Sequence, residues 1–115
     1  MTGESGWYQF DAGITIGQRG SERGIILQDE EHSDGARITL ECDGYTPFAI
    51  TCGIYGWMVH TRFFSLLEEA QQAFEEMKVA LAAILKQIPY ENDPDGEVRM
   101  ADVSKAIKQF IIQFQ

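Results

Sequence analysis

His60 and Arg62 are the residues of this chain whose types and spacing come closest to a chemical site. They stand two residues apart in a strand-forming stretch, so both side chains would point to one face of a sheet. We expect Thr51 and Tyr55 beside them, which makes these four residues a candidate ligand-binding group on the sheet face away from the helices. A histidine can act as a general base, and an arginine can hold a carboxylate or a phosphate.

The same group lacks the other parts of a catalytic site. No acid is placed by the sequence to orient His60, and no serine or cysteine stands in a recognisable nucleophile elbow. Polar pairs across neighbouring strands are the alternative explanation. A deep pocket containing His60 and Arg62 would favour an enzyme or a ligand-binding protein, whereas a flat, filled face would favour an interaction module.

The stretch between the two expected helices carries oxygen ligands at regular intervals. Glu91, Asp93, Asp95 and Asp102 occupy its positions 1, 3, 5 and 12, and Gly96 occupies position 6. This spacing resembles the EF-hand calcium loop, and the resemblance implies calcium at the four carboxylates. The stretch departs from that pattern because it begins with a glutamate and ends with the shorter aspartate. A connector in which the glycine bends the backbone before a helix is the alternative.

Two further polar stretches have the residue types for binding ions. Residues 29–34 combine four acids with a histidine, which suits a divalent metal but also a solvated turn. Residues 17–24, GQRGSERG, could cradle an anion with their backbone, although they lack the spacing and the lysine of a P-loop. A flexible hairpin connection is the preferred interpretation of these glycines.

The periodicity of apolar residues predicts an α+β fold. Alternation predicts about five strands within residues 7–64, the first of them at 8–16, and spacings of three and four predict helices at about 66–88 and 99–114. Strands followed by helices indicate an antiparallel β-meander with two α-helices packed on one face of the sheet. At 115 residues, the chain 1–115 is expected to form a single domain.

Residues 48–64 determine which side chains the sheet buries. Folded as a two-residue hairpin about Tyr55-Gly56, they place Ile54 opposite Trp57 and turn Thr51 away from the helices. A bulged continuous strand at Gly56 is the alternative. The hairpin predicts that one sheet face packs against the long helix, and this face consists of Ile38, Leu40, Phe48, Ile50, Cys52, Val59 and Phe63.

The charge balance limits the classes of partner. Eighteen acidic residues against nine basic ones give a formal net charge of −9. A nucleic-acid backbone requires a basic surface, so binding to nucleic acid is not expected. The charge is compatible with a basic protein partner and with plain solubility.

Cysteine usage and hydropathy point to a cytoplasmic protein. The two cysteines, Cys42 and Cys52, fall on apolar strand positions and are expected to be free and buried. No apolar run approaches the ~20 residues that span a bilayer, and the first residues lack the apolar core of a signal peptide. We expect neither a membrane nor a cofactor to be involved.

The long helix is apolar around most of its second half. One seam of it suffices to cover the sheet, which leaves apolar residues on its other sides. We expect a homodimer through this surface, because a two-fold axis buries the same patch on both subunits. The expected interface comprises Val79, Ala80, Ala82, Ala83 and Leu85, with Ile112 of the second helix.

Taken together, these patterns leave the biological role unassigned and favour a non-enzymatic protein-interaction or regulatory module of the adaptor or inhibitor type. The alternative is a small enzyme or ligand-binding protein that uses the sheet face around His60 and Arg62. A second alternative is weak calcium binding at residues 91–102.

Overall fold

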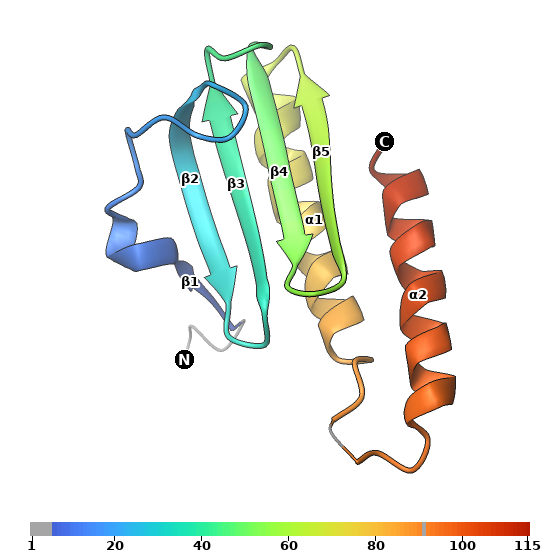
Figure 1. The fold of residues 1–115 in the computed structure, drawn as a ribbon. Coiled ribbons are helices and arrows are strands. Elements are labelled where there is room, and N and C mark those ends of the chain that lie inside the picture. Colours follow the sequence, from blue (N-terminus) through green and yellow to red (C-terminus); the bar gives the residue numbers. More distant parts are fainter. Residues whose placement is uncertain (1–5, 91) are drawn as a thin grey trace.

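The computed structural model describes residues 6–90 and 92–115 and confirms the expected α+β fold. Five antiparallel strands form a meander in the order β1-β2-β3-β4-β5, and two helices follow (Figure 1). The elements are β1 (Trp7–Gln9), a short 3₁₀ helix η1 (Phe10–Gly13), β2 (Ile25–His32), β3 (Ala36–Cys42), β4 (Phe48–Ile54), β5 (Met58–Phe64), α1 (Leu67–Leu85) and α2 (Gly96–Gln113).

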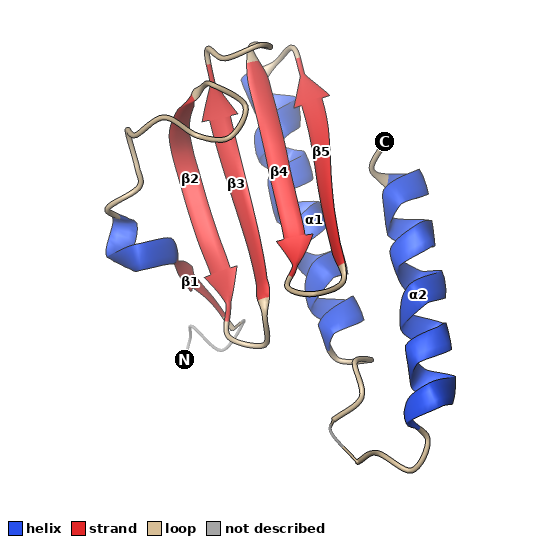
Figure 2. Ribbon diagram, viewed as in Figure 1, coloured by secondary structure: helices blue, strands red, loops and turns tan. Residues whose placement is uncertain are grey.

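The helices and the sheet form two layers. Figure 2 shows α1 crossing behind the sheet, where it packs against β3, β4 and β5, whereas α2 lies past the β5 edge and packs against α1. Within the described residues, neither α1 nor α2 covers the sheet face away from α1, and we call it the open face. Within the described residues, neither helix is long and apolar enough to cross a lipid bilayer.

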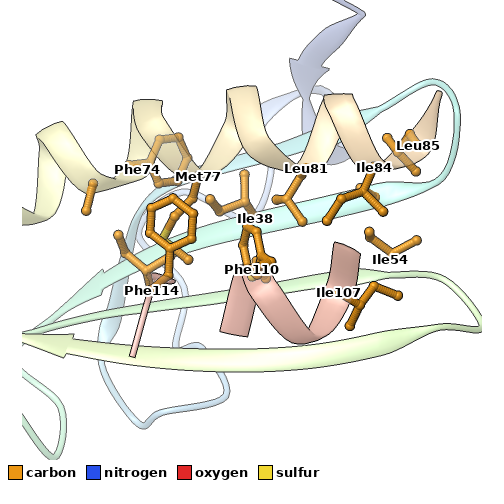
Figure 3. Close-up of a cluster of buried hydrophobic side chains, with 14 of the residues drawn as sticks. Ile38, Ile54, Phe74, Met77, Leu81, Ile84, Leu85, Ile107, Phe110 and Phe114 are labelled. Carbon is orange, nitrogen blue, oxygen red and sulfur yellow. The ribbon is translucent and has the colours of Figure 1, made fainter. Parts of the chain in front are cut away.

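The hydrophobic core lies between α1 and the sheet and is closed on one side by α2. Residues of α1 three and four apart, Phe74, Met77, Leu81 and Ile84, face the sheet (Figure 3). Buried side chains from the other elements complete this core, among them Ala36, Ile38, Leu40, Ile50, Cys52, Ile54, Val103, Ile107, Phe110 and Phe114.

The first strand is shorter than the alternation of residues 8–16 predicted. β1 ends at Gln9, and Asp11 and Ala12 have φ of 49° and 55°, so the chain turns away from an extended path. Ile14 and Ile16 then remain exposed, which shows that their alternation did not reflect burial. The turn sends residues 15–24 across the open face instead of along the sheet.

The predicted register of the β4–β5 hairpin was wrong by one residue. Ile54 pairs with Met58 and not with Trp57, because the connection has three residues, Tyr55 to Trp57. Gly56, with φ of 81°, supplies the positive φ that a turn closed by the Trp57 N–H and the Ile54 carbonyl requires.

A slip of one residue transfers every side chain of a strand to the opposite face. Val59 and Phe63 were expected in the core, yet they lie on the open face and are 77% and 52% exposed. His60 and Arg62 were expected on the open face, yet they point to the helix side together with Met58 and Phe64.

Candidate functional site

The structure divides the four predicted ligand-binding residues between the two faces of the sheet. Thr51 and Tyr55 line a groove on the open face, whereas His60 and Arg62 do not. His60 Nε2 lies 2.8 Å from the carbonyl oxygen of Phe114 and donates to it, and the imidazole packs edge-on against Phe110. His60 therefore holds the end of α2 against β5.

Arg62 has a similar structural surrounding. Its guanidinium lies 4.7 Å from the ring centre of Phe64 and 5.9 Å from that of Phe114. Cation–π contacts of this kind attach the charged group to aromatic surface. Neither His60 nor Arg62 is placed to act on a ligand in the groove.

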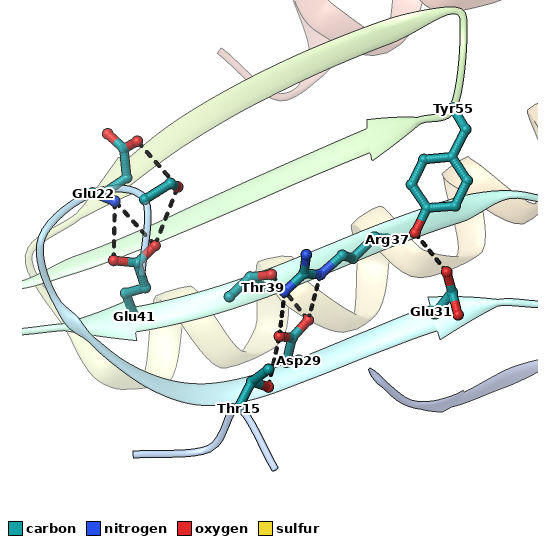
Figure 4. A network of polar contacts seen from close by, with 9 residues as sticks. Thr15, Glu22, Asp29, Glu31, Arg37, Thr39, Glu41 and Tyr55 are labelled. Atoms are coloured by element: carbon teal, nitrogen blue, oxygen red, sulfur yellow. Dashed lines mark hydrogen bonds and ion pairs between the residues drawn. The ribbon is translucent and has the colours of Figure 1, made fainter. Parts of the chain in front are cut away.

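A buried carboxylate organises the half of the open face formed by β2 and β3. Asp29 is 1% exposed and accepts two hydrogen bonds from Arg37, at 2.9 Å from Nε and 2.7 Å from Nη2 (Figure 4). The hydroxyls of Thr15 and Thr39 donate to the same carboxylate at 2.8 and 3.1 Å. A buried charge is stable only when paired in this way, and the Thr15 contact ties the N-terminal segment to the sheet.

A second buried carboxylate holds the glycine-rich stretch. Glu41 is 2% exposed and accepts the backbone N–H groups of Glu22 and Gly24, with the nearest contacts at 3.1 and 3.0 Å (Figure 4). A Cβ atom at Gly20 would overlap this carboxylate, so the glycine permits the close approach. Residues 17–24 thus cradle an anion, and that anion is a side chain of the protein itself.

These two carboxylates define a unit that we call the N-terminal clamp: Asp29, Arg37, Thr39 and Glu41 with residues 15–24. Every carboxylate oxygen of Asp29 and Glu41 accepts at least one hydrogen bond inside the clamp. The clamp therefore covers its half of the open face with polar groups that already have partners.

Glu31 of β2 connects β1 to the β4–β5 turn. The hydroxyls of Tyr8 and Tyr55 donate to its two oxygens at 2.7 and 2.6 Å. These bonds, that of Tyr55 first, lower the pKa of the Glu31 carboxyl. Burial and then the bond to Glu31 raise the pKa of Tyr55 to about 12. The contact fixes the Tyr55 ring at the end of the groove.

The groove lies between the clamp and β5 and has a volume of about 850 Å³. Thr51 and Gly53 of β4 line it, and Gly53 has no side chain to fill the space in front of its partner Val59. Residues 18–21 of the clamp line its opposite side. We call the uncovered half of the open face the β4–β5 surface: Thr51, Gly53, Tyr55, Val59 and Phe63.

The lining of the groove suits binding better than proton transfer. It contains Glu41, which is already held by backbone donors, and the guanidinium of Arg37, which is paired with Asp29. Burial raises the pKa of the Cys52 thiol to about 12, so this side chain stays protonated at neutral pH. The remaining groups are the Gln18 amide, the Arg19 guanidinium, which donates to the Arg23 carbonyl at 2.7 Å, and hydroxyls, backbone and apolar surface.

In the residues that it describes, the structure does not bring the predicted calcium ligands together as a metal site. Glu91 lies outside the described residues. Asp93 accepts the Asp95 N–H at 2.9 Å and forms an ion pair with Arg99 at 2.9 Å. Asp102 lies inside α2, which begins at Gly96, so it is not in the connecting loop.

The acidic stretch at residues 29–34 is likewise dispersed. Asp29 binds Arg37 on the open face, Glu30 forms an ion pair with Lys78 of α1 at 2.8 Å, and Glu31 binds the two tyrosines. Among the residues 6–90 and 92–115, no three histidine, cysteine or acidic side chains converge as a metal site.

The expected helix interface is smaller than its sequence suggested. Leu85 was assigned to it wrongly, because Leu85 is 5% exposed and belongs to the core. Ala80 and Ala82 are half-buried, whereas Val79 and Ile112 are 73% and 68% exposed. Self-association through the helices stays a prediction.

No protein-family model matches the chain, and comparison with curated proteins and with solved structures found no significant match. The assignment of a function therefore depends on the geometry alone. Sequence reasoning missed the exposure of Val59 and Phe63, and the signal that could have revealed it is Gly56. A glycine at the third position of a four-residue turn favours the closure that the structure shows.

Proposed function

We propose that this protein is a non-enzymatic interaction module of the adaptor or inhibitor type, and that its β4–β5 surface binds a partner polypeptide. One observation carries the proposal. Val59, 77% exposed, lines a preformed groove on the open face, and Phe63, 52% exposed, lies on the same face of β5 four residues further along the strand. Exposed apolar and aromatic groups that adjoin a hollow are typical of protein-binding sites.

The charges around the groove favour a polypeptide over a polyanion. The chain carries a net charge of −9, which opposes nucleic acid. In the groove, Glu41 and Arg37 are already held by partners, and the Arg19 guanidinium donates to the Arg23 carbonyl. The negative net charge of the chain would attract a partner that carries basic residues beside its docking segment. These charges also suit a module that binds its partner without a chemical reaction.

Selection of peptides tests the proposal. Linear 12-residue peptides from a random displayed library are selected on the immobilised protein, and each binder is titrated into ¹⁵N-labelled protein. We expect the amide shifts to concentrate on residues 49–63. A library that gives no binder, or binders whose shifts lie on α1 and α2, would contradict the proposal.

The groove volume supports a second candidate function, the binding of a small apolar molecule. A volume of about 850 Å³ lies within the range of ligand sites. Titration of a panel of drug-sized aromatic fragments into the same labelled protein separates the two candidates. Saturable fragment shifts confined to residues 51–59, in a protein that selects no peptide, would favour the small ligand.

A further inference from the structure

Among the described residues, the backbone of β5 pairs with β4 on one side and with no strand on the other. The Tyr55 N–H donates to the Gly35 carbonyl on the β3 side, and the Trp57 N–H donates to the Ile54 carbonyl on the β5 side. Backbone groups along an antiparallel strand alternate in direction. With Thr51 opposite Thr61, this alternation points the N–H and C=O groups of Val59, Thr61 and Phe63 away from β4, toward the free edge.

This edge lacks several of the features that usually protect an edge strand. β5 has seven residues, MVHTRFF, without proline, lysine or a bulge. Its one formal charge, Arg62, lies over the rings of Phe64 and Phe114. The opposite edge of the sheet is β1, which has three residues and leads directly into η1. A long, regular edge of this kind is a template for another strand.

The side chains of the same three residues extend the β4–β5 surface to the edge. Val59, Thr61 and Phe63 alternate with His60 and Arg62, so all three face the open side. A strand added beside β5 would place every second side chain against Val59 and Phe63. Backbone hydrogen bonds would then give affinity, and the alternate side chains would give specificity.

We propose that an extended segment of a partner protein adds to β5 as a sixth, edge strand. This inference rests on the proposed function and names its binding mode. The segment has apolar residues at alternate positions, facing the open side, and a basic residue near the Phe63 end. The basic residue would enter a hollow of about 490 Å³ beside Phe63, where the two carboxylates of Glu69 and Glu76 outnumber the single cation, Arg62.

The position of α2 favours such a segment over a second copy of this chain. α2 stands past the β5 edge on the right of Figure 1. A two-fold pairing of two β5 strands would bring both α2 helices to the one new junction. A single extended segment brings no helix with it and can use the edge.

A backbone substitution tests the inference with the peptides selected above. Thr61→Pro removes an N–H that β4 does not use, and edge strands tolerate proline where the N–H faces solvent. Thr61→Val keeps the N–H and serves as the matched control. We expect Thr61→Pro to weaken peptide binding about tenfold or more, and Thr61→Val to bind within about threefold of the unsubstituted protein.

N-methylation of the peptide gives the same test without changing the protein. In an added strand, every second peptide N–H points toward β5 and the others point to solvent. Methylation of the first set should abolish binding, and methylation of the second set should leave binding unchanged. Peptides that shift residues 49–63 but tolerate both Thr61→Pro and methylation would overturn strand addition and keep the proposed function. A dimer, detected by light scattering, that Thr61→Pro dissociates would make a second copy the occupant and overturn the inference.

Discussion

The two halves of the open sheet face differ in how far their side chains are covered and hydrogen-bonded. In the half formed by β2 and β3, the buried carboxylates of Asp29 and Glu41 accept hydrogen bonds from residues 15–24. These bonds hold the glycine-rich segment against the sheet. In the half formed by β4 and β5, the β4 residues are small and Val59 and Phe63 are left uncovered. The buried polar residues therefore maintain the fold, and the apolar β4–β5 surface is the half that is available to a partner.

Removal of Asp29 should produce the largest effect on stability. Asp29→Ala leaves Arg37 and the hydroxyl of Thr39 without their carboxylate. Because the Arg37 side chain is 36% exposed and can reach water, we expect a loss near the low end for buried ion pairs, about 3 kcal/mol.

Urea denaturation measures this change, with Asp34→Ala as the control. Asp34 is on the same β2–β3 hairpin, but its side chain is 65% exposed. The control should change the free energy of unfolding by less than about 0.5 kcal/mol. Equal effects of the two substitutions would show that the clamp does not depend on Asp29.

Glu41→Gln should have a smaller effect that is confined to the glycine-rich segment. The glutamine keeps the shape but exchanges a charged acceptor for one neutral oxygen and one donor. We expect a loss of about 2 kcal/mol and faster hydrogen exchange at the N–H groups of Glu22 and Gly24. Glu22→Gln is the control, since the Glu22 carboxylate makes only a 3.4 Å contact with Ser21. Unchanged exchange in Glu41→Gln would refute the cradle.

The sequence predicted the fold class because local patterns determine it. Apolar alternation marked β3 and β4, and three- and four-residue spacing marked both helices. The alternation of β5 is ambiguous, because both of its faces carry two large apolar residues. Gly56 is a local signal for the observed register, and contacts from α2 add the tertiary reason, because Phe110 and Phe114 cover His60 and Arg62.

The clamp was beyond prediction for a similar reason. The pair Asp29 and Arg37 requires the β2–β3 register, and the hydrogen bonds that Glu41 accepts require a segment 17 to 19 residues away to fold back. The residues were recognised as charged, but which of them meet depends on the tertiary structure. Only the ability of residues 17–24 to cradle an anion was visible as an alternative.

Glu31→Gln should lower the pKa of Tyr55, which lies at the boundary between the two halves of the open face. The raised pKa of Tyr55 favours its neutral form, so the contribution to stability is present below pH 10.0 and is lost as pH rises toward about 12. The lowered pKa of Glu31 contributes above 4.5, its ordinary value, and that contribution is lost as pH falls.

Absorbance of tyrosinate against pH measures the effect. In Glu31→Gln, the late-titrating tyrosine should ionise at lower pH, though still above the ordinary value because burial remains the larger cause. Tyr55→Phe serves as the control and should remove the step near pH 12, leaving Tyr8, whose pKa the bond to Glu31 also raises. A step near pH 12 that survives Tyr55→Phe would contradict its assignment to Tyr55.

The most direct test of the β4–β5 surface compares two valines with similar exposure. Val59 on the open face and Val79 on α1 are 77% and 73% exposed, so replacement of either by lysine should leave stability within about 0.5 kcal/mol. Calorimetric titration of the selected peptides then reports which face binds. We predict that Val59→Lys weakens binding at least about tenfold and that Val79→Lys leaves it unchanged. Binding that survives Val59→Lys, or is lost in Val79→Lys, would contradict the assignment of function to the β4–β5 surface.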